Sequence, residues 1–190
     1  MQSPVAEVLR SLEAALREAG ARWYLFGAQA ALVHGAARLT SDVDATVLWD
    51  VDDVEPLVAA LDRRGLALRP VPVDFIGRTR VVPLVHRSTS MQVDLVLGGP
   101  GLEELFASRA VPRALDGVTV PVATAEDLLV MKVLAGRPKD LDDVRALLSS
   151  NRDRLDLGHV RTVLGELEQA LGRGDLLAEL ERALRSLDGL

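Results

Sequence analysis

The sequence predicts an α+β protein in which every expected strand lies before about residue 123 and the last third is helical. Short apolar runs separated by Gly, Pro and Asp turns occupy the first part of the chain. Apolar residues at three- and four-residue spacing occupy the last part. This change of pattern predicts an α/β core at residues 1–123 and a helical region at residues 124–190 packed on it.

Length and composition agree with this division. The chain has 190 residues, 48% of them hydrophobic, and none is cysteine. A chain of this size can bury a large hydrophobic core, so collagen-like, disordered and disulfide-framework proteins are excluded. No apolar run approaches the roughly 18 residues of a membrane span, and the N-terminus lacks the apolar segment of a signal peptide. We therefore expect a cytoplasmic protein that makes no membrane contact.

The first elements have clear boundary signals. Ser3 and Pro4 begin a helix that ends before Gly20. Residues 66–97 have a β-like pattern, with Val71 and Val73 among prolines. The other elements expected in this part are strands at 23–26, 43–49, 81–85 and 91–97 and helices at 28–33, 54–64 and 102–108.

The later elements are a hairpin and a series of helices. Asp116-Gly117 is the preferred two-residue turn of a β-hairpin. Thr124, with Asp127 three residues further on, has the pattern of a helix start. The helices expected from there on lie at 125–135, 141–149, 157–171 and 176–187.

The net charge of −6 argues against broad electrostatic binding of nucleic acid, but one segment is basic. Between Arg63 and Arg87 the only acidic residue is Asp74. The arginines of this segment are Arg63, Arg64, Arg69, Arg78, Arg80 and Arg87. They form either a solvated face or a track for an anionic acceptor such as a tRNA acceptor stem.

Three aspartates are candidate metal ligands. Asp42 and Asp44 lie two apart on an expected strand, so both side chains point to one face, where their like charges favour a bound cation. Asp94 lies among apolar residues of another expected strand. If the two strands are neighbours, the carboxylates converge on a site that suits Mg²⁺ or Mn²⁺ and does not suit zinc. The alternatives are a polar turn for Asp42 and Asp44 and a salt bridge with an arginine for Asp94.

These residues occur in a pattern that resembles the DNA polymerase β-like nucleotidyltransferase superfamily. The superfamily has a strand, a Gly-Gly or Gly-Ser pair, a short helix, Asp-x-Asp on the next strand and a third Asp on a later strand. The matching residues are Phe26-Gly27-Ala28, His34-Gly35, Arg38, Thr40, Asp42-Val43-Asp44 and Val93-Asp94-Leu95. A second block at residues 124–148 is similar to the helical motif of the AbiEii-type, toxin-related branch; its residues include Lys132, Arg137, Asp140 and Asp143.

The resemblance implies an enzyme that transfers a nucleoside monophosphate from an NTP to a hydroxyl, such as a tRNA 3′ end, as a toxin with an antitoxin partner. It implies that Asp42, Asp44 and Asp94 hold Mg²⁺ or Mn²⁺ and that Lys132 serves catalysis by facing a phosphate. The residues implied to bind the nucleotide are Gly27, Ala28, Arg38, Ser41, Lys132, Asp140 and Asp143. Ala28 departs from the pattern, because it has no hydroxyl to offer a phosphate.

Alternatives remain at this point. The chain is either such an enzyme, a non-catalytic nucleotide- or partner-binding descendant, or an adenylyltransferase of small molecules such as aminoglycosides. Lys132 could instead be an ordinary lysine at the protein surface. Asp140 and Asp143 could instead belong to an ion network on a helix surface, since Lys139 and Asp143 are four residues apart.

Overall fold

The computed structural model describes residues 3–36 and 40–188 and divides into two compact units. The core unit comprises Met1–Gln29 and Leu39–Ala123, and the helical unit comprises Ala30–Arg38 and Thr124–Leu190. The strands all belong to the core unit, so the predicted α+β class, with a mixed sheet first and helices last, is confirmed.

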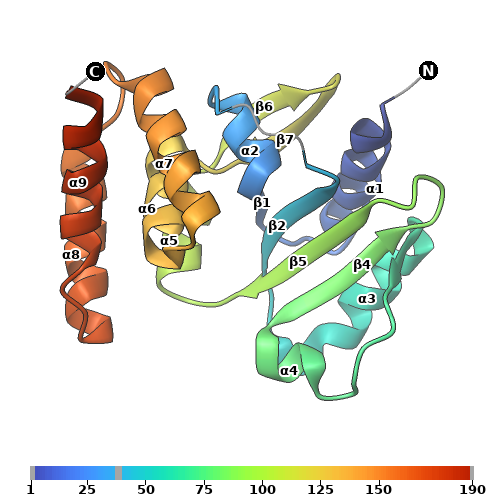
Figure 1. Ribbon diagram of the computed structural model, residues 1–190. Helices are drawn as coiled ribbons and strands as arrows, with labels where there is room; N and C mark the ends of the chain where they lie inside the picture. The colour runs from blue at the N-terminus through green and yellow to red at the C-terminus, as the bar shows by residue number, and fades with distance from the viewer. Residues whose placement is uncertain (1–2, 37–39, 189–190) are drawn as a thin grey trace. The chain divides into compact units, whose positions relative to one another are not determined.

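The core unit is built on one seven-stranded sheet with the order β3-β4-β5-β2-β1-β7-β6 (Figure 1). Its strands are β1 (Trp23–Phe26), β2 (Asp42–Leu48), β3 (Leu66–Leu68), β4 (Val81–His86), β5 (Gln92–Gly98), β6 (Val111–Leu115) and β7 (Val118–Val122). The sheet is mixed, because β2 pairs with β5 and β1 with β7 in parallel while the other neighbours are antiparallel.

The two faces of the sheet centre differ in burial. Val43, Ala45 and Val47 of β2 point to one face and are fully buried. This face carries the core, with α1 (Pro4–Glu18) and α3 (Val54–Arg63), which contact each other and the sheet. The alternate residues of β2 point to the opposite face, where α5 (Leu102–Arg109) covers only one end through an edge-on contact of Phe106 with Tyr24. At the start of β2, Asp42 and Asp44 point to this second face and are half-buried.

The hairpin and most helix boundaries follow the sequence signals. Asp116 and Gly117 both have positive φ, as the tight turn between β6 and β7 requires. Thr124 accepts a hydrogen bond from the Asp127 backbone N–H and begins α6 (Ala125–Ala135). The remaining helices of this unit are α7 (Pro138–Asn151), α8 (Leu157–Leu171) and α9 (Leu176–Asp188). Helix α7 begins three residues earlier than expected, because Pro138 takes the first helical position, which needs no N–H donor.

One expectation is wrong. Val71 and Val73 do not form a strand, and the residues after them, Phe75–Thr79, form the short helix α4. A separate 3-10 turn lies at Val51–Asp53. Pro70 and Pro72 lack the N–H groups that a ladder needs, and the Arg78 N–H bonds to the Asp74 carbonyl instead. The helix ends at Arg80, whose φ of 55° is left-handed.

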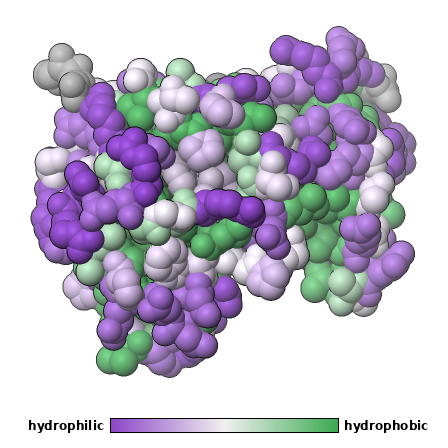
Figure 2. Space-filling view, turned by 180° about the vertical axis from the view of Figure 1, so that it is seen from behind, coloured by the Kyte–Doolittle hydropathy of each residue, from purple (hydrophilic) through white to green (hydrophobic). Residues whose placement is uncertain are grey.

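The helical unit also takes in the end of α2 (Gly27–Val33), which begins in the core unit. The Asn151 amide donates to the His34 carbonyl at 2.7 Å, and the Ser150 hydroxyl donates to the Gly35 carbonyl at 3.1 Å. These bonds tie residues 34 and 35 to the end of α7. Hydrophilic residues cover much of the face seen in Figure 2. Among the helices that the structure describes, none has the length and apolar character needed to cross a membrane.

Candidate active site

Asp44 and Asp94 lie directly opposite each other on the parallel strands β2 and β5. Neighbouring strands are about 4.8 Å apart, and residues paired in this way project to the same face of a sheet. Asp42 lies one pleat earlier on β2, opposite Gln92 of β5. The sheet register thus brings three carboxylates and one amide to the half-exposed start of these two strands.

Asp94 is engaged by an arginine. The Arg69 Nη2 donates to Asp94 Oδ1, and Arg69 Nη1 donates to Gln92 Oε1 at 2.8 Å. The salt-bridge alternative for Asp94 is therefore present in the structure. Arg69 is a site residue that the sequence interpretation did not single out, because only the order of the strands brings it to Asp94.

The other two carboxylates have neighbours of their own. The Thr40 hydroxyl donates to Asp42 Oδ1, and the carboxylate of Asp44 lies against the backbone of Gly27. A Cβ atom at residue 27 would be 2.0 Å from Asp44 Oδ2, and Gly27 has a φ of 70°. Glycine is needed at this position both for the turn from β1 into α2 and for the close approach of Asp44.

The donors at this end of β2 and β5 are oxygen atoms, the kind of ligand that a divalent cation takes. Carboxylate oxygens are the ligands that Mg²⁺ and Mn²⁺ prefer. Within residues 3–36 and 40–188, however, no three acidic, histidine or cysteine side chains are arranged to hold a metal ion. The backbone register supplies adjacent donors, and the side chains of Asp42 and Asp94 would have to exchange Thr40 and Arg69 for the ion.

The expected nucleotide-binding residues of this region lie in different settings. Ala28 is buried in the first turn of α2, and Ser41 is exposed just before β2. Arg38 lies outside the described residues. Both described residues lie next to the carboxylates along the chain: Ala28 follows Gly27, which contacts Asp44, and Ser41 lies between Thr40 and Asp42.

Lys132 in the helical unit is the centre of a buried ion cluster. Only 8% of its surface is exposed, and its Nζ donates to Asp140 Oδ1 at 3.0 Å and to Asp143 Oδ2 at 2.6 Å. Arg137 also donates to Asp140. Burial by itself raises the pKa of Asp140, but the hydrogen bonds from Arg137 and Lys132 outweigh it and hold the pKa below its ordinary value.

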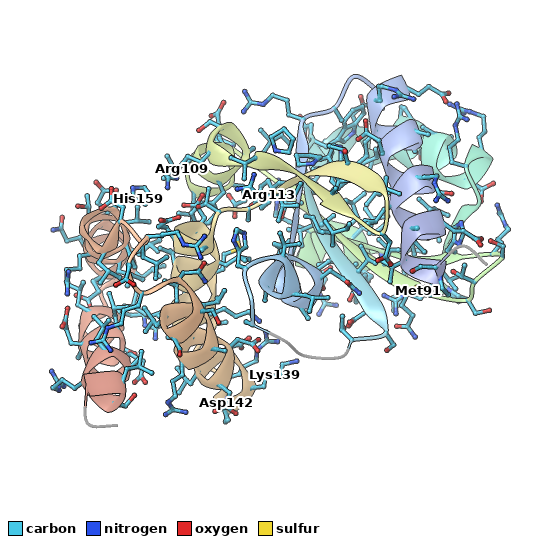
Figure 3. All side chains as sticks on the ribbon, turned by 90° about the horizontal axis from the view of Figure 1, so that it is seen from above. Met91, Arg109, Arg113, Lys139, Asp142 and His159 are labelled. Atoms are coloured by element: carbon cyan, nitrogen blue, oxygen red, sulfur yellow. The ribbon has the colours of Figure 1, made fainter. Side chains whose placement is uncertain are left out.

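The cluster differs from the surface alternatives considered for it. Lys132 is not a surface lysine, and the partner of Asp143 is Lys132 rather than Lys139. Lys139 is exposed. Figure 3 shows the side chains of Lys139 and Asp142 on the outside of α7. In the sequence, the burial of Lys132 is indicated only by its two apolar chain neighbours, Met131 and Val133.

The arginines of segment 63–87 are mostly neutralised by carboxylates of the core unit. Arg63 and Arg64 both pair with Glu18. The further pairs are Arg69–Asp94, Arg78–Asp74 and Arg87–Asp62. Among the described residues Arg80 alone of these six has no carboxylate partner; its Nε donates to the Leu97 carbonyl at 2.9 Å. These arginines therefore offer little unpaired positive charge to an RNA backbone.

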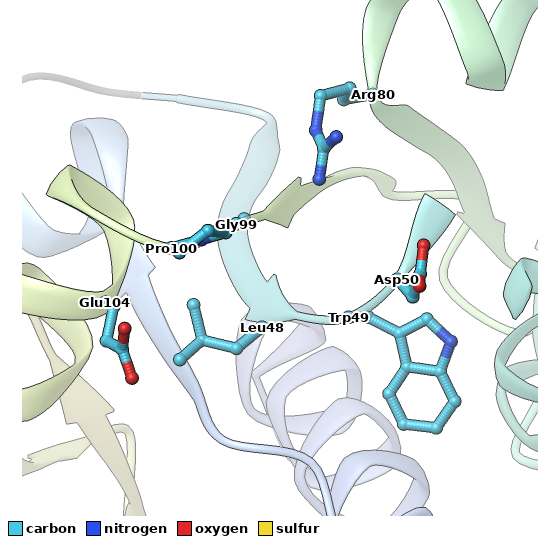
Figure 4. A pocket seen from close by; sticks show the side chains of 8 residues that line it. Leu48, Trp49, Asp50, Arg80, Gly99, Pro100 and Glu104 are labelled. Carbon is cyan, nitrogen blue, oxygen red and sulfur yellow. The ribbon is translucent and has the colours of Figure 1, made fainter. Parts of the chain in front are cut away.

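A cavity of about 500 Å³ lies at the far end of β2 and β5. Its lining residues are Leu48, Trp49, Asp50, Arg80, Gly98, Gly99, Pro100 and Glu104 (Figure 4). Leu48 is four residues beyond Asp44, which is about 13 Å along a strand. The cavity and the carboxylates are thus separate features of the same sheet.

Comparison with known families identifies the class of protein to which this chain belongs. The family described as nucleotidyltransferase of unknown function (DUF6036) matches residues 7–173. The protein is therefore a nucleotidyltransferase, and the chain belongs to this family. No curated protein matches the sequence.

Solved structures show the same fold. ANT(2″)-Ia in complex with adenylyl-2″-tobramycin has a TM-score of 0.61 and 13% identity, covering 89% of this chain and 99% of that one. An antigenic nucleotidyltransferase-like protein from Paracoccidioides brasiliensis has a TM-score of 0.51 and 20% identity, covering 93% of each chain. The lincomycin-bound lincosamide antibiotic adenylyltransferase LnuA has a TM-score of 0.50 and 13% identity, covering 79% and 99%. At these identities the similarity is one of fold.

Proposed function

We propose that this nucleotidyltransferase depends on a divalent metal and transfers a nucleoside monophosphate from an NTP to a hydroxyl group, with release of pyrophosphate. The observation that carries the proposal is the placement of Asp44 opposite Asp94, with Asp42 on the same face. Two adjacent carboxylates that stay partly open to solvent suit a divalent cation. No other pair of strands in the core unit places two aspartates opposite each other among the described residues.

In this proposal Asp42, Asp44 and Asp94 bind Mg²⁺ or Mn²⁺. When bound, such ions would lower the pKa of the attacking hydroxyl and balance the negative charge of the leaving pyrophosphate. Gly27 lets the backbone come close to the site, and Ala28 leaves phosphate contacts to backbone N–H groups. Arg38 and Ser41, which flank the acidic strand in sequence, are proposed to contact the phosphates as the resemblance implies.

Lys132, Asp140 and Asp143 enter the proposal as one ion cluster. The resemblance implies that Lys132 faces a phosphate. Because its Nζ is held by both carboxylates, this contact needs Nζ to leave one of them. A catalytic Lys132 therefore predicts that its loss removes activity even under conditions in which the variant is folded.

We propose a small hydroxylated molecule as the acceptor. The ion pairs of Arg63, Arg64, Arg69, Arg78 and Arg87 leave little free positive charge for an RNA backbone. The similar fold accommodates small acceptors in two of the solved structures, which hold adenylyl-2″-tobramycin and lincomycin. The second candidate acceptor is a tRNA 3′ end, in a toxin-like enzyme of the AbiEii-type branch with an antitoxin partner; residues 124–148 favour it through their resemblance to that branch.

The experiment is a labelling screen. The protein is incubated with Mg²⁺ or Mn²⁺ and each α-labelled NTP, alone, with bulk tRNA, and with a panel of hydroxylated small molecules that includes aminoglycosides and lincosamides. Metal-dependent pyrophosphate release with label on a small molecule is the expected result. Label on tRNA would replace the acceptor assignment by the second candidate. NTP binding without turnover in every arm would contradict the enzymatic proposal and favour a non-catalytic descendant.

A further inference from the structure

Arg69 lies in one cross-strand row with the carboxylates. It follows β3, and its backbone N–H donates to the Pro83 carbonyl of β4 at 2.8 Å. Pro83 lies opposite Asp94, and Asp94 lies opposite Asp44. Residues in one row of a sheet project to the same face, so the long Arg69 side chain crosses over the short ring of Pro83 to reach Asp94. The register of four strands, rather than a chance surface contact, brings this arginine to the site.

The guanidinium group is held by two side chains of β5. Nη1 donates to Gln92 and Nη2 donates to Asp94. Gln92 in turn lies opposite Asp42. Both partners of Arg69 are therefore direct neighbours of the two aspartates on β2.

The third nitrogen of the same group, Nε, has no hydrogen-bond partner. Arg69 Nε is buried without a hydrogen-bond partner, and among the described residues it is the only buried side-chain nitrogen or oxygen of this kind. Native proteins pair nearly all such atoms, so each exception needs a physical reason. The reason here is that the position of the guanidinium is set by Asp94 and Gln92.

Adjacent carboxylates repel each other unless a cation lies beside them. In this structure Arg69 is the cation beside Asp94. Arg69 holds Oδ1 of Asp94, so a divalent ion bound by Asp94 and Asp44 would lie at short range from the guanidinium and would be repelled by it.

We propose that Arg69 is the internal counter-cation of the site, which holds Asp94 in the metal-free protein and opposes the binding of a divalent ion by Asp94. This inference rests on the proposed function, since it takes Asp94 as a metal ligand. Arg69 is a positioning residue in this role: it competes for Asp94 and does not itself need to contact the reacting atoms.

The test is the affinity for Mn²⁺, measured from the free-ion electron paramagnetic resonance signal. In Arg69→Gln the competing cation is gone, so we expect a Kd about two- to fivefold lower than in the wild type, the range for the loss of one partly exposed ion pair. Arg69→Lys keeps the positive charge and should stay close to the wild type. Arg87→Gln, which breaks the Arg87–Asp62 pair by the same substitution, is the matched control and should leave the Kd unchanged.

The same substitution made in the Asp94→Asn variant distinguishes competition at Asp94 from a general effect of removing a positive charge. In Asp94→Asn the side chain for which Arg69 and the ion compete is no longer charged, so adding Arg69→Gln should change the Kd by less than twofold. Urea unfolding of each variant shows which of them are folded under the assay conditions, and Arg69→Lys provides the comparison if Arg69→Gln is not.

The outcomes distinguish the role of Arg69 from the metal dependence of the protein. An unchanged or higher Kd in Arg69→Gln, with Mn²⁺ binding intact in the wild type, overturns the role of Arg69 and leaves the proposed function in place. An equal gain in affinity in the Asp94→Asn background also overturns it. Absence of Mn²⁺ binding in both the wild type and Arg69→Gln overturns the metal dependence itself, and the inference with it.

Discussion

The carboxylate of Asp44 occupies the space that a side chain on Gly27 would need. The Cβ of any other residue at 27 would be 2.0 Å from Asp44 Oδ2 and 2.7 Å from its Cγ. The glycine of the Phe26-Gly27-Ala28 motif therefore serves Asp44 directly, in addition to the phosphate approach that the resemblance implies.

Gly27→Ala should both strain the backbone and displace Asp44. Gly20→Ala is the matched control, because Gly20 has nearly the same φ, 65° against 70°, and nothing lies within 4 Å of its Cβ position. We expect a loss of about 1 kcal/mol in the free energy of unfolding for Gly20→Ala and at least about 2 kcal/mol for Gly27→Ala. Urea denaturation measures both. Equal losses in the two variants would show that Asp44 does not constrain residue 27.

Lys132 and Lys139 are the only lysines of the chain, and they have opposite environments. Lys132→Met should lower the free energy of unfolding by about 3 kcal/mol, because Asp140 and Asp143 lose a buried counter-ion. Lys139→Met removes an exposed lysine and should change it by less than about 0.5 kcal/mol. Denaturant unfolding at pH 7 compares them, and similar small losses in both would contradict the buried cluster.

His86 makes the core unit sensitive to acid. Its ring bonds to the hydroxyls of Ser11 and Thr89, at 3.1 and 2.9 Å. Burial lowers the pKa of His86 below its ordinary value of 6.5, and the nearby Glu7 carboxylate only partly opposes this. The unfolded chain therefore binds a proton more readily than the folded one, so the stability is complete above pH 6.5 and falls as the pH is lowered below it.

The check is the urea midpoint between pH 8 and pH 5.5. The wild type should lose stability below pH 6.5, and His86→Gln, which keeps a side chain able to bond to Ser11 and Thr89, should lose less over the same interval. Parallel curves for the two proteins would show that His86 is not the source of the pH dependence.

Local signals in the sequence predicted much of the fold. The Asp116-Gly117 turn, the Thr124 helix start and the two acidic strands could be placed because each depends on a few adjacent residues. The β-like prediction for Val71 and Val73 was wrong, because valines between prolines have a strand composition but Pro70 and Pro72 cannot donate to a ladder.

The contacts of the site could be predicted only in part. The alternation of a strand places Asp42 and Asp44 on one face, but the pairing of Asp44 with Asp94, fifty residues later, depends on the strand order. A salt bridge of Asp94 with an arginine was an expected alternative, yet nothing in the sequence selects Arg69 from six arginines. Lys132 shows the same limit, since helical spacing suggested Lys139 as the partner of Asp143 whereas the packing of α6 on α7 brings Lys132 there.

The most direct test of the central claim is Mn²⁺ binding by Asp44→Asn and Asp94→Asn. Asp62→Asn is the control, because Asp62 is an ion-paired, half-exposed aspartate of the same unit that lies outside the row of site residues. We expect the wild type and Asp62→Asn to bind Mn²⁺ with the same Kd, and each site variant to bind at least about tenfold more weakly. Unchanged Mn²⁺ affinity in Asp44→Asn and Asp94→Asn would contradict a metal site on these two strands.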